Sequence, residues 1–433
     1  MSSSTSTLIA KIRDFLGLER NILVLCTTGI LINFGSSIYS PFLPLHFENI
    51  GASLALLGPI FSALAVASAF ITVPGGHFAD RFGRKRITIL GSAMMAIAMV
   101  PLYWIGAWPL VVACLMISNF GRDVYRPGTY AMIVESVPVD RRATAFSIMG
   151  LIAFSGGLIG PIVGGYLSLS GDYHILFVAS AISFTIMTLL RQTFLVETKG
   201  RKNPNVKEEA KETNKKTLSF TDKLRLTWES SPSTRAYLIF GVTSALAGSI
   251  AGPYFAAFYL RILNLDQLQI GSLATISLIP NMLCQLPGGK LADRIGRKPL
   301  ALLALLSSPL IVFAITQATS FNQLILIQLL SGAVTGLSTG ALYTLPTELV
   351  AEEYRATALG VFNTTSQLAG AIGPSLGGLI ILIYPFLTYP RHIFYISILS
   401  GIPSIILFAI SVKETLRKRD DVHSNANQGE TAP

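Results

Sequence analysis

The feature that most constrains this chain is a glycine-rich, basic stretch that occurs twice, 213 residues apart. The first copy spans Pro74–Arg86 and contains Ala-Asp-Arg-Phe-Gly-Arg-Lys. The second spans Pro287–Pro299 and contains Ala-Asp-Arg-Ile-Gly-Arg-Lys. Other motifs recur at the same spacing: Glu135 and Glu348, Arg142-Ala-Thr-Ala and Arg355-Ala-Thr-Ala, and Gly160-Pro161 and Gly373-Pro374. Twice this spacing nearly fills the 433 residues, so the chain consists of two copies of one unit.

The composition places this unit in a membrane. Hydrophobic residues make up 51% of the chain and charged residues 13%, whereas soluble domains carry roughly 25% charge. A helix needs about 20 apolar residues to cross the hydrocarbon. Twelve such runs are predicted, at 22–45, 53–76, 86–107, 109–134, 143–169, 174–196, 235–260, 267–291, 299–319, 322–347, 356–383 and 391–413.

These runs predict an all-α integral membrane protein with two pseudosymmetric bundles of six helices. The N-terminal bundle covers 1–196, and the C-terminal bundle covers 235–433 and includes a polar tail. The stretch between them, 197–234, is rich in Lys and Glu and is predicted to be a linker.

The basic residues predict the orientation. Twelve spans put both termini on one side, and that side also holds the linker and all but four of the 33 Lys and Arg residues. The four exceptions are Arg122 and Arg126 within a span and Arg261 and Arg391 on the other side. By the positive-inside rule the termini and linker are cytoplasmic, and the location is the cell membrane. Contact with anionic lipid headgroups explains the net charge of +10 without a nucleic-acid partner.

Several classes of function are not supported. The N-terminus lacks the features of a signal peptide, so the first run is predicted to be a retained span. The five histidines and three cysteines are scattered, so no metal site is expected. No nucleophile–base set and no phosphate-binding glycine loop occurs, so we expect neither an enzyme nor a cofactor, and the source of energy is not ATP. A monomer is expected.

The duplicated stretch resembles the signature between spans 2 and 3 of the major facilitator superfamily. The matching residues are Gly76, Asp80, Arg81, Gly83 and Arg84, with Gly289, Asp293, Arg294, Gly296 and Arg297 in the second half. The resemblance implies two bundles around a central cavity and transport by alternating access, with protons favoured as the coupling ion. The Gly-Pro-x-x-Gly-Gly of span 5 is similar to a signature of the drug–proton antiporter branch, and it recurs in span 11.

The charges around this signature predict two gating clusters on the cytoplasmic side. Asp80 and Arg84 are four residues apart, so a helical turn would pair them, and Glu135 is a second acid within reach of Arg84. The resemblance implies that Asp80 also faces the start of span 11, where the helix dipole favours an anion. The corresponding cluster contains Asp293, Arg297 and Glu348 and would meet the start of span 5. Both clusters are interpreted as latches of the outward-open state. The alternative is that these charges only determine topology.

Span 4 carries charges near the middle of the membrane. Arg122 and Arg126 lie on one helix face, and Asp123 and Arg126 are three residues apart and can pair. Arg122 is then unbalanced, at a depth where a charge costs at least about 2.5–3.5 kcal/mol. Three interpretations are open: Arg122 binds an anionic group of the substrate, Arg122 and Asp123 couple transport to protons, or the charges only hold spans together.

Other candidates are polar residues within apolar runs, which usually face the bundle interior. The candidates for the cavity wall are Asn33, Tyr39, Tyr125, Asn281, Gln285, Gln328, Asn363 and Gln367. In spans 5 and 11, Gly160, Pro161, Gly164, Gly165, Gly373 and Pro374 mark either tight packing between the halves or a bend that moves during transport.

The sequence as a whole favours a secondary transporter of a small solute. Proton-coupled export of an amphipathic compound or organic anion is the first interpretation. Proton-coupled uptake of an organic anion or nutrient is the second, and a membrane receptor that does not transport is a remote third.

The gating interpretation predicts the effect of Asp80→Asn. Loss of the carboxylate should lower turnover in liposomes, while insertion and orientation stay unchanged because acidic residues contribute little to topology. Unchanged turnover would leave the charges as topology determinants only.

Overall fold

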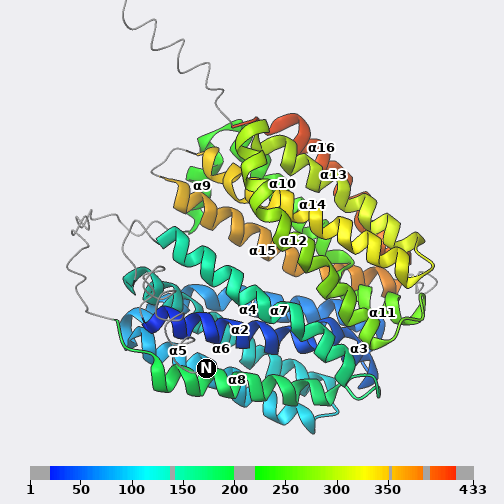
Figure 1. Cartoon of the computed structure of the whole chain (residues 1–433). Coiled ribbons are helices and arrows are strands. Elements are labelled where there is room, and N and C mark those ends of the chain that lie inside the picture. Colours follow the sequence, from blue (N-terminus) through cyan, green and yellow to red (C-terminus); the bar gives the residue numbers. More distant parts are fainter. Residues whose placement is uncertain (1–19, 137–141, 199–219, 351–353, 384–390, 416–433) are drawn as a thin grey trace, which may run out of the picture.

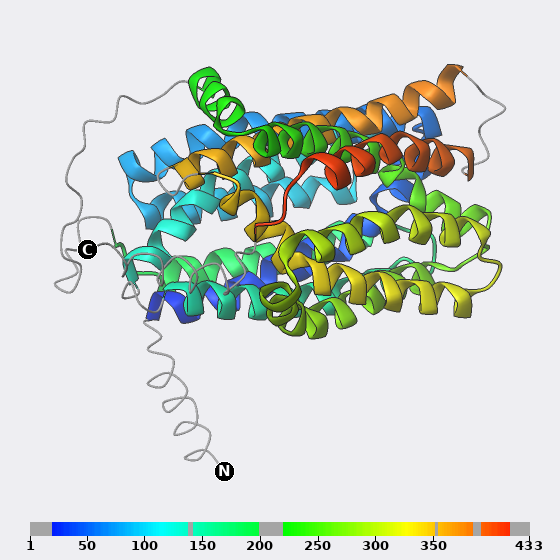
Figure 2. The ribbon, with the colours of Figure 1, turned by 90° about the horizontal axis from the view of Figure 1, so that it is seen from above.

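A computed structural model describes residues 20–136, 142–198, 220–350, 354–383 and 391–415 (Figure 1). The regular elements within these ranges are all helical. Nine of the helices are long and apolar enough to cross a membrane by length and composition. The long helices run along one common direction (Figure 2).

Twelve long helical segments follow one another within these ranges. The first half contains α2 (Arg20–Tyr39) continued by η1 (Ser40–Phe42) and α3 (Leu43–Asn49), then α4 (Leu54–Phe82), α5 (Arg84–Met99) with η2 (Val100–Tyr103), α6 (Trp108–Ser136), α7 (Arg142–Leu167) and α8 (His174–Phe194). The second half contains α10 (Pro232–Ile250) continued by η4 (Gly252–Tyr254) and α11 (Phe255–Arg261), then α12 (Gln267–Ile295), α13 (Arg297–Gln317), α14 (Phe321–Glu348), α15 (Arg355–Ile383) and α16 (Arg391–Ser411). This arrangement confirms the predicted all-α fold.

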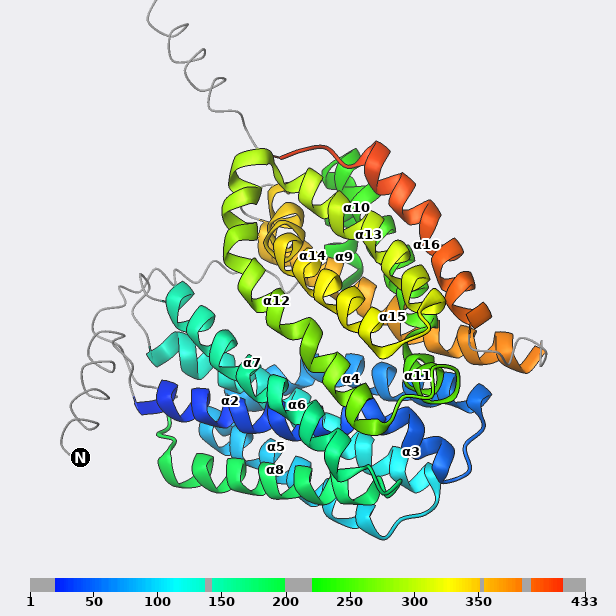
Figure 3. The same cartoon turned by 45° about the vertical axis from the view of Figure 1, so that its right-hand side comes forward.

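The two halves repeat the same internal packing. In the first half α2 packs against α7 and α8, and in the second half the corresponding α10 packs against α15 and α16. The halves meet where α4 packs against α15 and where α7 packs against α12. In Figures 1 and 3 the two bundles lie close together around α3 and α11 and diverge toward the opposite end.

We call the end where α2 begins and α16 ends the terminal face, and the opposite end, around α3 and α11, the distal face. Contacts across the halves cluster near the distal face. Arg261 forms an ion pair with Glu48 at 3.0 Å, and the backbone N–H of Ser375 donates to Ser62 Oγ at 2.9 Å. The hydroxyl of Thr275 donates to the carbonyl of Leu158 at 2.7 Å. The structure therefore shows a conformation that is closed at the distal face.

Two equivalent contacts between backbones form the seam between the halves. Gly58 of α4 lies against the carbonyl of Pro374, and Gly271 of α12 lies against the carbonyl of Pro161. A Cβ atom at either glycine would overlap the facing carbonyl oxygen, so a side chain here would force the halves apart. Because little hydrophobic force joins helices in lipid, such close packing is a main source of their association.

The glycines of spans 5 and 11 serve packing both within and between the halves. Gly160 and Gly164 face α2 of their own half, at Ser37 and Ile38. Gly165 faces α12 at Gln267. In span 11, Gly373 likewise faces α10 of its own half at Ser249. Pro161 and Pro374, where bends were predicted, both lie inside continuous helices. Their role as bends that move during transport remains a prediction.

The duplicated signature is helical for most of its length, which differs from the predicted loop. α4 continues to Phe82 and α12 to Ile295, because charged residues can prolong a helix once it has left the hydrocarbon. The turn is confined to Gly83, with φ of 100°, and Gly296, with φ of 106°. These angles are readily adopted by glycine alone.

The linker region also holds an unpredicted helix, α9 (Phe220–Ser230), which packs against α10 and α15. Its sequence, FTDKLRLTWES, mixes charged and apolar residues and contains no apolar run long enough to predict a membrane span.

The positive φ at Gly296 generates a prediction about stability. Gly296→Ala should lower the free energy of unfolding by about 1–3 kcal/mol, because a Cβ atom is strained in this conformation and would overlap the Glu414 carboxylate. Gly360→Ala, inside α15 with open space around it, is the matched control and should be neutral or stabilising. Unfolding in mixed micelles of increasing denaturing detergent measures both, and equal stability of the two variants would contradict the prediction.

Candidate functional site

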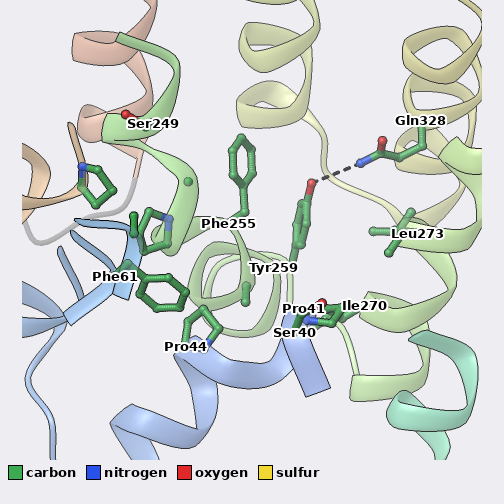
Figure 4. A pocket seen from close by; sticks show the side chains of 16 residues that line it. Ser40, Pro41, Pro44, Phe61, Ser249, Phe255, Tyr259, Ile270, Leu273 and Gln328 are labelled. Carbon is green, nitrogen blue, oxygen red and sulfur yellow. Dashed lines mark hydrogen bonds between the residues drawn. The ribbon is translucent and has the colours of Figure 1, made fainter. Parts of the chain in front are cut away.

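A cavity of about 480 Å³ lies between the halves, beneath the distal contacts (Figure 4). Short breaks in the first and seventh spans shape it. Pro41 in η1 and Pro253 in η4 have no N–H to continue the helix, so both spans break at the same level. The two halves contribute Ser40, Pro41, Pro44, Phe61 and Ala65, and Ser249, Gly252, Pro253, Phe255, Ala256, Tyr259, Ile270, Leu273, Ala274, Gln328 and Pro374.

The cavity wall is mainly apolar and aromatic, with a few polar groups. Gln328 Nε2 donates a hydrogen bond to Tyr259 Oη at 3.4 Å, and Ser40 and Ser249 supply hydroxyl groups. No Asp, Glu, Lys or Arg is among the described residues that line it. The wall therefore suits a solute with a large apolar surface and a few hydrogen-bonding groups.

The structure places Gln328 in this wall, but the other predicted cavity residues lie elsewhere. Asn33 is exposed and donates to the carbonyl of Gly29 at 2.9 Å. Tyr39 is buried against Phe177. Gln285 donates to Asn281 at 2.8 Å, and Asn363 and Gln367 are exposed on α15.

The charges of span 4 pair differently from the expected pattern. Asp123 Oδ1 contacts Nε of its neighbour Arg122 at 3.4 Å, and its pairing with Arg126 stays a prediction. Arg126 reaches along the helix toward the next turn, where its guanidinium carbon lies 5.9 Å from the ring centre of Tyr130. The Asp123 side chain is 5% exposed and that of Arg122 is 37% exposed. Asp123 is thus a buried acid held by one long contact.

A buried arginine near the end of α8 was not predicted from the sequence. Arg191 of α8 is 2% exposed and was counted among the basic residues of the cytoplasmic side. Its Nε donates to Thr28 Oγ1 at 3.2 Å and its Nη1 to Ser92 Oγ at 2.8 Å. Its guanidinium carbon lies 4.4 Å from the ring centre of Tyr125. One side chain therefore joins α2, α5, α6 and α8.

The predicted gating residues of the first half form an ordered network near the terminal face. Arg84 Nη2 pairs with Glu135 Oε1 at 2.8 Å. Glu135 also accepts a hydrogen bond from the hydroxyl of Thr198 at 2.5 Å. Glu197 accepts from the backbone N–H groups of Arg84 and Lys85, both at 3.1 Å, and so caps α5. A carboxylate is favoured there by the unpaired N–H groups and the helix dipole.

The second half repeats this network. Arg297 pairs with Glu348 at 3.0 Å and with Asp293 at 3.4 Å. Glu414 caps α13 through the N–H groups of Arg297 and Lys298, and Thr415 donates to Glu348. The Glu-Thr pairs at 197–198 and 414–415 were missed, although their recurrence just after the last span of each half was a usable signal.

The remaining gating residues stay predictions. Asp293 is 73% exposed at its side chain, Arg294 and Arg355 are exposed, and Arg81 stacks on Phe82. Gly289 has open space around it. The side chains of Asp80 and Arg142, and the surroundings of Gly76, lie outside the part of the chain that the structure describes.

Comparisons with known proteins agree over nearly the whole chain. The family model of the Major Facilitator Superfamily matches residues 25–245 and 237–431. Multidrug resistance protein MdtG of Proteus mirabilis is 25% identical over 92% of this chain and 98% of that protein. The protein of the same name from Salmonella typhi is 26% identical over 93% and 96%.

Solved structures share the fold. The nucleoside transporter NupG has a TM-score of 0.69 at 16% identity, and the match covers 91% of this chain and 100% of that chain. A D-xylose-proton symporter has a TM-score of 0.70 at 17% identity, with 92% and 98% covered.

The contacts of Arg191 generate a prediction. Arg191→Lys should lower the free energy of unfolding by about 2 kcal/mol. A lysine cannot reproduce the two hydrogen bonds of the planar guanidinium or its stacking on Tyr125. Arg225→Lys, on the exposed face of α9, is the matched control and should unfold like the parent chain. Equal unfolding curves for Arg191→Lys and the parent chain would show that the planar guanidinium and its stacking on Tyr125 contribute nothing.

Proposed function

The chain belongs to the Major Facilitator Superfamily, and from this premise we propose that it exports amphipathic organic compounds in exchange for protons. It is a multi-pass membrane transporter of small solutes. The observation that carries the proposal is the match, over more than nine-tenths of the chain, to proteins named for multidrug resistance.

The shape of the central cavity supports this substrate class. Its volume of about 480 Å³ accommodates a small organic molecule. The aromatic wall of Phe61, Phe255 and Tyr259 offers surface for flat apolar groups without fixing one orientation. Hydroxyl and amide groups in the wall add hydrogen bonds without demanding a particular charge. Such a wall discriminates weakly, which suits export of several compounds.

The contacts between the halves also support a way in which the molecule changes between a conformation open at the terminal face and one open at the distal face. The distal face is closed by the Gly58–Pro374 and Gly271–Pro161 contacts and by the Glu48–Arg261 ion pair. Opening this face requires both halves to separate along the seam. In the proposed cycle the terminal face then closes, and Asp80 and Asp293 latch it against span 11 and span 5.

Asp123 is the proposed proton carrier. It is buried, and its Oδ2 has no hydrogen-bond partner among the described residues. Burying a carboxylate is costly unless it is well hydrogen-bonded, and here Oδ2 is left without a partner among the described residues. Arg122, its neighbour, contacts Oδ1 at 3.4 Å.

The proposed orientation of the protein in the membrane follows from the distribution of its basic residues. The terminal face is cytoplasmic by the positive-inside rule, so the conformation described here is open toward the cytoplasm. Labelling of a cysteine placed in α9 by a membrane-impermeant reagent tests this orientation, and labelling in intact cells would reverse it.

Transport by reconstituted protein tests the function. Liposomes containing the parent chain should move ethidium against its gradient when a proton gradient is imposed. Asp123→Asn should abolish this uphill transport but retain exchange of labelled for unlabelled ethidium, because exchange needs no net proton movement. Asp222→Asn, on α9, is the control and should behave like the parent chain.

Other outcomes separate the alternatives. Proton movement in the same direction as the solute would establish uptake. Transport of the anion carboxyfluorescein that is lost in Arg122→Gln would make Arg122 the anchor of an organic anion. No flux of either probe by the parent chain would count against transport of amphipathic compounds altogether.

A further inference from the structure

Two adjoining hollows lie inside the second half, beside four positions whose counterparts in the first half hold large buried side chains. One hollow, of about 310 Å³, lies between α11, α13 and α14, and another, of about 130 Å³, lies between α10, α13 and α16. The two share Phe255, Ser308 and Val312 in their walls. We call these adjoining hollows the C-half chamber.

The pseudosymmetry of the chain explains the chamber. The repeated helix caps and ion pairs of the two halves match α5 to α13, α6 to α14 and α8 to α16. In the first half the matching positions are fully packed, with Met95 2% exposed and Met99, Phe184 and Met187 0% exposed. Their counterparts in the second half are Ser308, Val312, Gly401 and Ser404, which line the chamber. Loss of four large side chains leaves the space.

The chamber adjoins the central cavity. Phe255, Tyr259 and Gln328 line both the central cavity and the larger hollow. The hydrogen bond between Gln328 and Tyr259 spans the boundary at 3.4 Å, a long and therefore weak bond (Figure 4). Rotation of these two side chains would join the spaces.

The walls define the chemistry of a ligand. Hydroxyl groups line the chamber, and no charged side chain is among its described wall residues. Ser307 donates to the carbonyl of Leu303 at 2.6 Å, Thr335 to that of Ser331 at 2.8 Å and Ser404 to that of Gly401 at 2.6 Å. Since these hydroxyl hydrogens are already used, the oxygens can take part in further hydrogen bonds only as acceptors. Pro309 adds a further acceptor, because it leaves the carbonyl of Leu305 without its helical partner.

We propose that the C-half chamber is a second part of the substrate site and binds an uncharged group that donates hydrogen bonds, such as an alcohol or amide. The inference rests on the proposed export function and names the part of the substrate that this half selects. Charged groups are disfavoured in the chamber because no charged side chain among its described wall residues could offset their desolvation. Apolar groups of the same solute stay in the aromatic central cavity.

Filling the chamber with the residues of the first half tests the inference. The full chain is reconstituted in liposomes, and two probes are compared. Chloramphenicol is an uncharged amide with a nitrophenyl group and two hydroxyl groups. Ethidium is a flat cation whose ring amines can donate hydrogen bonds but whose charge is disfavoured in the chamber. Ser308→Met and Ser404→Met introduce the methionines found at the matching positions. Ser400→Met, on the exposed face of α16 outside the chamber, is the matched control.

We expect Ser308→Met to raise the KM for chloramphenicol about tenfold, which corresponds to about 1.4 kcal/mol of binding, and to leave ethidium kinetics unchanged. Ser400→Met should change neither. Thr335→Val removes one acceptor without a change of volume, so it keeps the test valid if the methionine variants fail to fold. It should raise the KM for chloramphenicol about threefold, within the range of one hydrogen bond.

The outcomes distinguish this inference from the proposed function. If the parent chain exports ethidium but does not bind chloramphenicol, or if Ser308→Met and Thr335→Val leave chloramphenicol kinetics unchanged, the chamber holds only water and the inference is overturned while export stands. If the variants impair both probes alike, the chamber has a structural role and the inference is again overturned. If the parent chain moves neither probe, both proposals fall.

Discussion

Close approach of helix backbones is the constraint on which the rest of this structure depends. Hydrocarbon gives helices little hydrophobic reason to associate, so contact must come from dense packing. At Gly58 and Gly271 the absent side chain lets one helix rest on a carbonyl oxygen of the other half. The facing carbonyls belong to Pro374 and Pro161, so both seams use the same pair of residue types. The cavity lies directly beneath these seams, and its position follows from them.

Each half, by contrast, is held together by polar bonds at the terminal face. Glu197 and Glu414 follow the last helix of their halves and cap the third helix. The Arg84–Glu135 and Arg297–Glu348 ion pairs add the fourth helix to each network. Four helices of the first half are joined again at Arg191. Bonds of this kind stiffen each bundle, whereas the bundles meet through glycine–carbonyl van der Waals contacts and a few polar contacts near the distal face, so motion is easier between the halves than within them.

The sequence was sufficient for the fold because both of its signals are local or repetitive. Apolar runs identify spans, and the duplicated signature divides the chain. The Arg84–Glu135 pair was predictable from its recurrence as Arg297–Glu348. The cavity wall was not predictable, because Tyr259 and Phe255 look like ordinary apolar residues of a span. Only the helix breaks at Pro41 and Pro253, seen in the structure, show that the first and seventh spans change direction beside the cavity. The burial of Arg191 was not predictable for another reason. It lies three residues from the end of α8, where an arginine normally indicates topology. Its long side chain turns inward and donates to Ser92 and Thr28.

The two seams have a consequence for the symmetry of the molecule. Each half carries both partners of the contact, a glycine on its second span and a proline on its fifth. An even number of spans also gives both halves the same direction through the membrane. Two identical copies of one half would therefore form the same glycine–proline contact twice, related by a two-fold axis along the membrane normal, as in a closed two-fold dimer. The fused chain keeps that isologous interface, while the unequal interiors of its halves break the equivalence and give the cavity between them two chemically different sides.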